Sequence, residues 1–500
     1  MDKEFVPHIK FSSLSDIYPE LSLPSQITRY KKLIDSFEKL YNRKPKFIAR
    51  SPGRVNLIGE HIDYAGFGVL PMAINRDVLI AVDIIHEGEE NDMKVRVANV
   101  LNENYPPRNW KYEGKEKIVE IEVKEGISEW GNYPKSGYKG IVQHSSLDKP
   151  KGMYLLVDGN VPPGAGLSSS AAFICSVCIA TCSSNDVKLT KKEIVEIAIE
   201  AERSIGMNAG GMDQTASMFS LKDHVLYIQF LPSLCATPTK LPSTNPPIAF
   251  VIANSLITSD KIVTAPTNYN LRVVETKLAA YHLGQCLFNK PCENLKKVSD
   301  LYSNSIEVTI ENLIKLLDYI EKVYENNHDG FTLDELSSLL NLNQDEIKDK
   351  FLSRFPVKAE KFQLYKRSKH VFEESSRVLK FYELCSKSEA RGSIFEELGN
   401  LLNESHKSCK ELFECSCDEL DDLVKICLDG GAVGSRLTGA GWGGCTVSLI
   451  RENEIDKFIN FVSEKYYNVR FSHLSHNDLE NFIFATRPGG GAAIIENLFN

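Results

Sequence analysis

A loop of small and polar residues, Val161-Pro162-Pro163-Gly164-Ala165-Gly166-Leu167-Ser168-Ser169-Ser170, leads into an apolar stretch from Ala171 to Cys182. The apolar stretch is predicted to be a helix, and the serines would stand at its N-terminus. Free amide groups and the helix dipole attract anions there, and glycines let a phosphate approach the backbone. A turn followed by a serine-capped helix is the alternative, but two glycines and three serines exceed what a cap needs. The loop therefore favours phosphate binding, although it lacks the G-K-S/T of a P-loop.

A second motif, Ser51-Pro52-Gly53-Arg54-Val55-Asn56-Leu57-Ile58-Gly59-Glu60-His61-Ile62-Asp63-Tyr64, is dense in polar side chains. One arginine, two carboxylates and one histidine occur within ten residues, framed by glycines. A solvated polar loop is the simpler interpretation. The density of the pattern instead favours a loop that binds many hydroxyl groups at once, as a sugar requires.

A third motif, Leu437-Thr438-Gly439-Ala440-Gly441-Trp442-Gly443-Gly444-Cys445, contains a formal G-x-G-x-x-G. A dinucleotide-binding fingerprint must follow a strand and open a helix. The residues that follow this motif, 445–450, are β-branched and alternate in polarity, which predicts a strand. The dinucleotide interpretation is excluded, and a tight turn beside a ligand remains.

One acid stands at a bend in Gly210-Gly211-Met212-Asp213-Gln214. A carboxylate placed directly after two glycines can reach a substrate hydroxyl and serve as general base. On its own this feature is a weak indication.

Composition sets the broad class. The 500 residues include 58 Lys plus Arg and 67 Asp plus Glu, a formal charge of −9, which argues against a nucleic-acid binder. Apolar residues at 42% and charged residues at 25% exclude disordered and fibrous classes. The first residues lack the apolar run of a signal peptide, and the longest apolar stretch is too short for a membrane span. A cytoplasmic protein without membrane or nucleic-acid partners is expected.

Strand-like runs with interspersed helices predict α+β or α/β layering. Three prolines in residues 241–247 mark the best boundary, which gives domains 1–245 and 246–500. The charged, helix-forming region at about 290–356 is expected to be an insertion in the second domain.

Together the motifs resemble those of the GHMP small-molecule kinases and, among them, the galactokinases. G-R-V-N-L-I-G-E-H-I-D-Y at 53–64 resembles the galactokinase sugar signature, and P-x-G-x-G-L-S-S-S-A-A at 162–172 resembles the family's ATP loop. The glycine-rich motif at 437–445 is similar to the family's third motif. Residues 264–275 are especially similar to the fungal galactokinase branch.

The resemblance implies an α+β fold of two domains. The N-terminal domain would contain a left-handed βαβ unit of the ribosomal-protein type, and the C-terminal domain would be ferredoxin-like. ATP, Mg²⁺ and the sugar would meet in the cleft between them.

The resemblance also implies roles for individual residues. Asp213 would be the catalytic base, with Arg54 beside it to stabilise charge on the transferred phosphoryl group. The sugar would be bound by Arg54, Glu60, His61, Asp63, Gly210, Asp213 and Tyr269. The nucleotide would be bound by Gly164, Gly166, Ser168, Ser169, Asn254 and Ser255. Mg²⁺ would be bound by Ser168 and Glu202.

The implied reaction is ATP-dependent phosphorylation of α-D-galactose at its C1 hydroxyl, the first step of galactose catabolism by the Leloir pathway. One alternative is an N-acetylgalactosamine kinase, whose first motif is similar. The other is a galactose and ATP sensor that binds a transcriptional repressor. Such sensors lack part of the Ser-Ser-Ala-Ala segment, whereas residues 168–172 are complete here. The sequence leaves a regulatory protein partner open and favours a monomer.

Overall fold

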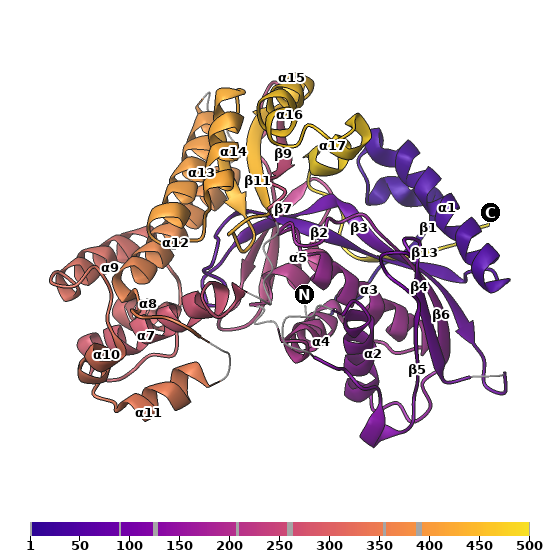
Figure 1. Cartoon of the computed structure of the whole chain (residues 1–500), viewed down its shortest axis with the longest axis horizontal. Helices are drawn as coiled ribbons and strands as arrows, with labels where there is room; N and C mark the ends of the chain where they lie inside the picture. The colour runs from indigo at the N-terminus through magenta and orange to yellow at the C-terminus, as the bar shows by residue number, and fades with distance from the viewer. Residues whose placement is uncertain are drawn as a thin grey trace.

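The computed structural model describes residues 3–89, 92–123, 129–206, 210–257, 264–353, 357–386 and 393–499. A large sheet with its helices forms one part of the molecule, a smaller sheet with its helices forms a second, and a group of helices lies to one side (Figure 1). Among the described residues, no helix has both the length and the apolar character that crossing a lipid bilayer requires.

The large sheet has seven strands in the order β1-β13-β2-β3-β6-β4-β5. Their bounds are His8–Lys10 (β1), Ala493–Glu496 (β13), Phe47–Ile58 (β2), Leu70–Ile85 (β3), Gly152–Gly159 (β6), Lys94–Asn99 (β4) and Arg108–Lys111 (β5). Side chains alternate between the faces of a strand. Ile48 and Leu79 accordingly pack with α1 (Leu23–Tyr41) on one face, whereas Ala49 and Ile80 belong to the larger core on the other.

On that other face, α3 (Ser169–Ser184) and α5 (Met212–Phe219) contact the strands, and α2 (Asn132–His144) and α4 (Lys191–Ser204) pack against α3. α3 is buried along nearly its whole length, as its apolar sequence predicts. α4 begins at the capping box of Thr190 and Glu193, in which each side chain bonds the other residue's backbone amide. A two-stranded ribbon, β7 (His224–Gln229) with β8 (Cys235–Lys240), completes this part.

The smaller sheet is antiparallel, with strand order β10-β11-β9-β12. Its strands are β9 (Ile248–Asn254), β10 (Gly434–Thr438), β11 (Cys445–Arg451) and β12 (Ile483–Thr486). Its helices are α13 (Ile394–Glu411), α14 (Asp418–Asp429), α15 (Ile455–Val462), α16 (Asn468–Arg470) and α17 (His476–Phe482). The order of elements along the chain is a strand, helices, two strands, a helix and a strand. This is the order of a ferredoxin-like unit, the fold expected for the second domain.

The remaining helices are α7 (Tyr269–Phe288), α8 (Leu295–Ser303), α9 (Ile310–Val323), α10 (Leu333–Leu340), α11 (Gln344–Ile347) and α12 (Leu364–Ser386). Short 3-10 or π turns occupy Phe11–Asp16, Glu20–Ser22, Lys115–Lys117, Lys348–Leu352, Glu452–Glu454 and Ser463–Tyr467. α12 contacts α7, α9 and α13, so it joins the helices of residues 290–353 to the smaller sheet's helices. It also contacts β2 of the large sheet.

The division at residue 245 does not hold for the end of the described chain. β13 pairs with β2 antiparallel and with β1 parallel, so residues 493–496 belong to the first sheet rather than to the second domain. The four residues of β13, three apolar and one glutamate, are too short a run to show strand periodicity, and they cover what would otherwise be an open edge of β2.

Candidate active site

The three glycine-containing motifs meet where the two sheets approach each other, and their glycines pack against one another's backbone. A β-carbon on Gly166 would lie 2.8 Å from the carbonyl oxygen of Thr438. A β-carbon on Gly439 would lie 2.5 Å from the carbonyl oxygen of Gly166, and one on Gly53 2.8 Å from that of Leu167. These glycines therefore allow three loops to touch, in addition to any contact with a ligand.

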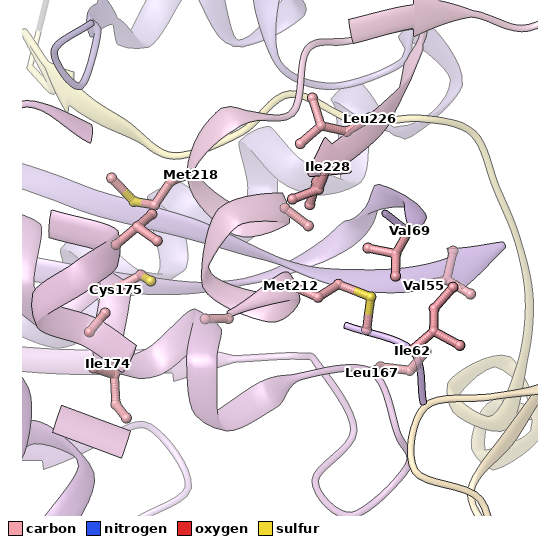
Figure 2. Packing of buried hydrophobic residues seen from close by; sticks show 14 of the residues in the cluster. Val55, Ile62, Val69, Leu167, Ile174, Cys175, Met212, Met218, Leu226 and Ile228 are labelled. Carbon is pink, nitrogen blue, oxygen red and sulfur yellow. The ribbon is translucent and has the colours of Figure 1, made fainter. Parts of the chain in front are cut away.

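Apolar neighbours of the site residues anchor the same loops in the core. Val55 of β2, Ile62 of the first motif, Leu167 of the second and Met212 before Asp213 are all buried members of one cluster. Figure 2 shows them gathered in one region of that cluster. Because each is adjacent or nearly adjacent to a polar site residue, core packing sets the positions of those polar side chains.

Arg54 and Asp213 form the central ion pair of the site. Arg54 lies in β2, and Asp213 lies in the first turn of α5. The guanidinium donates to Asp213 Oδ1 through Nε (2.8 Å), with the second nitrogen Nη2 2.7 Å from the same oxygen. Its Nη1 donates to the carbonyl oxygen of Gly166 (2.6 Å). One buried cation thus joins the candidate base to the candidate phosphate loop.

The carboxyl group of Asp63 lies close enough to Asp213 to interact with its charge. Burial and the negative charge of Asp213 raise the pKa of the Asp63 carboxyl to about 7. A β-carbon at Gly210 would collide with Asp63 Oδ2, so glycine is the residue that lets this carboxylate stand there. The Tyr269 ring lies nearby, with its centroid 5.6 Å from that of Tyr64.

His61 is held among aromatic rings. Its Nε2 is 2.9 Å from the carbonyl oxygen of Ala440, which can only accept, so Nε2–H donates and Nδ1 faces the Tyr64 hydroxyl at 2.9 Å. The ring stacks on Phe413 with centroids 4.7 Å apart and contacts Tyr269 and Trp442. His61 has φ +61°, a conformation that residues with a β-carbon seldom adopt.

Glu60, which the resemblance predicts to bind the sugar, also holds two loops together. It is buried, and its carboxylate accepts from Asn56 Nδ2 (2.8 Å) and the amide of Gly439 (2.7 Å). Arg436 of β10 lies 2.8 Å away and is itself fully buried. This ion pair ties the first motif to the third. Sequence analysis did not single out Arg436, because its strand also contains Ser435 and Thr438 and so carries no local sign of a buried charge.

Glu202 and the serines at the start of α3 form the candidate metal site. Glu202 is buried and accepts from Ser170 Oγ (2.6 Å) and from Gln214 Nε2. The serine hydroxyl that contacts Glu202 is that of Ser170, and Ser168, the predicted Mg²⁺ ligand, begins the same run of three serines. Ser168 precedes α3 at φ +60°, and within the described part of the chain its hydroxyl is buried without a hydrogen-bond partner.

A carboxylate with two hydroxyls suits Mg²⁺, which prefers oxygen ligands and usually takes one or two from the protein. Among the residues described, no three His, Cys, Asp or Glu side chains gather as a metal site.

Asn254 and Ser255 follow β9 beside the third motif. The Ser255 amide donates to the carbonyl oxygen of Gly444 (2.8 Å), and its hydroxyl, fully buried, accepts from the Ile257 amide (3.3 Å). Asn254 Oδ1 accepts from the Leu256 amide (2.9 Å). These bonds shape a turn.

In the second motif, Gly164 (φ +70°) is exposed and Ser169 is half-buried, so both are open to a ligand.

Comparison with known proteins decides the family. The galactokinase galactose-binding signature matches residues 35–84, and the GHMP kinase N- and C-terminal domains match residues 132–220 and 388–468. The chain is 39% identical to the galactokinase of Saccharomyces cerevisiae over 504 residues, which cover 93% of this chain and 94% of that protein. The chain belongs to the galactokinase family. It is thereby a phosphotransferase that uses ATP.

Other galactokinases agree. The galactokinase of Dictyostelium discoideum is 39% identical over 97% of both chains, and that of Bacillus subtilis is 31% identical over 83% of this chain and 88% of its own. A crystal structure of Lactococcus lactis galactokinase complexed with galactose matches with a TM-score of 0.68 at 23% identity, over 93% of this chain and 99% of that one. That likeness shows the two-domain GHMP kinase fold, and the higher identity to yeast agrees with the expected fungal-like branch.

Proposed function

We propose that this chain transfers the γ-phosphoryl group of ATP to the C1 hydroxyl of α-D-galactose, giving galactose 1-phosphate. The observation that supports this most strongly is the Arg54–Asp213 pair, which connects an acid beside the sugar signature to the backbone of the ATP loop. The curated relatives at 36–39% identity all carry the name galactokinase, which favours galactose over N-acetylgalactosamine and an enzyme over a sensor.

Asp213 acts as the base that takes the proton of the C1 hydroxyl. Arg54 holds this carboxylate by two nitrogens at Oδ1, which fixes its orientation beside the sugar signature. As the phosphoryl group moves, charge grows on its oxygens, and the fixed guanidinium stabilises that charge without having to reorganise. Most of the acceleration comes from this placement rather than from covalent chemistry.

The sugar hydroxyls are bound by Asp63, His61, Tyr269 and the backbone at Gly210, with Glu60 contributing through the loop that it stabilises. A site whose buried polar groups match one pattern of hydroxyls rejects an epimer strongly, since the wrong epimer leaves those groups unpaired. Asp63 and Asp213 together therefore set both orientation and selectivity.

ATP is bound by Gly164, Gly166, Ser168 and Ser169 at the start of α3, with Asn254 and Ser255 next to the third motif. Amides at this helix N-terminus face the phosphates. Glu202, with the hydroxyls of Ser168 and Ser170, holds Mg²⁺, which neutralises phosphate charge when bound. The enzyme is proposed to be a cytoplasmic monomer.

A coupled ADP-release assay with galactose, N-acetylgalactosamine, glucose or no sugar tests the proposal. Galactose should support turnover well above the other sugars, and Asp213→Asn should abolish most of it. Turnover that is equal for galactose and N-acetylgalactosamine, or absent with galactose, would contradict the assignment of substrate.

A further inference from the structure

The first turn of the sugar-signature loop forms a binding site for an anion, and a distant side chain occupies it. Gly59 has φ +109°, and the amides of Gly59 and Glu60 both point at Oε1 of Glu374, at 2.9 and 3.3 Å. Successive amides that converge on a negative group form a nest. The occupant, Glu374, lies on α12, 315 residues after Gly59.

Glu374 is fully buried and fully bonded. Its Oε1 also accepts from Ser405 Oγ (2.6 Å), and its Oε2 accepts from Arg377 Nε (2.7 Å). Burial alone would raise its pKa, but the charges of Arg377 and Arg436 hold the pKa at about 2. The carboxylate is therefore charged at neutral pH, and its bonds to the turn are charge-assisted.

His370, one helical turn before Glu374, holds the other side of the same peptide. Its Nε2 is 3.0 Å from the carbonyl oxygen of Glu60, which only accepts, so Nε2 carries the proton. Burial lowers the pKa of His370 to about 4, so the ring is neutral and Nδ1 accepts from Ser408 Oγ at 2.8 Å. α12 thus binds two amides and one carbonyl of the turn.

The same helix also reaches the side chain of His61. The His370 ring lies against Phe413 with centroids 4.4 Å apart, and Phe413 stacks on His61 at 4.7 Å. His61 must keep a left-handed backbone conformation, which is unfavourable for any residue with a β-carbon. The bond from His370 to the peptide before His61 and the stacking of Phe413 on its ring both hold His61 in this conformation.

We propose that Glu374 and His370 are positioning residues for galactose: they hold the Gly59–His61 turn in the shape that aims the sugar-binding side chains. This rests on the proposed function of that loop. Neither residue is expected to touch the sugar, and their described hydrogen bonds go to the turn, to α12 itself and to serines of α13. Their loss should weaken galactose binding while leaving ATP binding nearly unchanged.

The test compares Glu374→Gln, His370→Leu and His370→Gln in the full-length enzyme. Galactose Kd is measured by calorimetry without nucleotide, and KM is measured for both substrates. Glu374→Gln removes the charge that strengthens the bonds to the turn, and His370→Leu removes the bond to the buried Glu60 carbonyl. Each loss corresponds to about a tenfold or greater rise in galactose Kd and KM. ATP KM should stay within about twofold, and His370→Gln, whose amide can still donate to Glu60, should recover most of the galactose affinity.

Phe381→Leu is the control, because Phe381 is fully buried on the same helix and takes no part in the described hydrogen bonds to the Gly59–His61 turn. It should lower Tm without changing galactose Kd. If the buried variants do not fold, Ser408→Ala removes only the hydroxyl that orients His370, and it should raise galactose Kd by about threefold.

Equal changes for both substrates, or a lower Tm with unchanged galactose Kd, would overturn the positioning role. Turnover of the wild type tests the proposed function, which the absence of galactose phosphorylation would refute. The ratio of variant Kd to wild-type Kd tests only the positioning role of Glu374 and His370.

Discussion

Replacing Asp63 with asparagine should stabilise the ligand-free protein, and more so at pH 8 than at pH 5. The carboxyl of Asp63 faces Asp213, and burial with that neighbouring charge raises its pKa to about 7. The folded protein therefore binds a proton here more tightly than the unfolded chain does. The stabilising contribution is full below the unfolded pKa of about 4 and is lost as pH rises through about 7.

The size follows from the two pKa values. A pKa of about 7 against about 3.9 in the unfolded chain corresponds to an upper limit of about 4 kcal/mol destabilisation at pH 8 and about 1.5 kcal/mol at pH 5. Asp63 is only partly buried, so solvent screening reduces both figures. We expect Asp63→Asn to raise the free energy of unfolding by about 1–3 kcal/mol more at pH 8 than at pH 5, since asparagine stays neutral.

Urea unfolding of the wild type and Asp63→Asn at pH 5 and pH 8, without sugar or nucleotide, measures this difference. The variant should also lose turnover, which would make Asp63 a residue kept for function at a cost in stability. Equal stability changes at the two pH values, or a variant less stable than the wild type at pH 8, would refute the reasoning.

Other predictions concern the reaction and the loops. Asp213→Asn should lower kcat by about 10²–10⁴-fold and leave galactose Kd within about threefold; an unchanged kcat in initial-rate assays would remove its role as base. Gly166→Ala should lower stability by about 1–2 kcal/mol or more and raise the KM for ATP, because φ is +75° and the new methyl group would lie 2.8 Å from a Thr438 oxygen. Gly159→Ala is its control in thermal melts, since the nearest atom lies 3.6 Å away, and equal effects would contradict the loop-packing explanation. Ser170→Ala should raise the Mg²⁺ concentration needed for half-maximal rate by about threefold or more at fixed ATP, and an unchanged Mg²⁺ titration would argue against this serine.

Local signals carried the sequence analysis where neighbours decide the structure. The buried helix after Ser168 and the strand after the third motif both follow from short-range patterns, and the structure has both. Family resemblance supplied the two-domain fold and the candidate residues, which periodicity alone did not reach.

Contacts between distant segments could not be read in the same way. Glu374 lies on a long helix whose pattern explains it as one polar residue among many, so nothing local marks its bonds to Gly59 and Glu60. Nothing local in the sequence predicts the bond from Ser170 to Glu202 or the left-handed backbone of Ser168. The glycines suggested a ligand, whereas part of their task is to let other loops approach.

The place of β13 makes completion of the first sheet depend on the timing of synthesis. β2 ends at residue 58, and the strand that covers its outer edge begins only at residue 493. At about 5–20 residues per second, a ribosome needs on the order of tens of seconds to make the intervening chain. During that interval β2 carries an open edge, which is a template for pairing with other chains. This topology therefore exposes nascent or truncated chains to aggregation. A chaperone that covers a strand edge would prevent it.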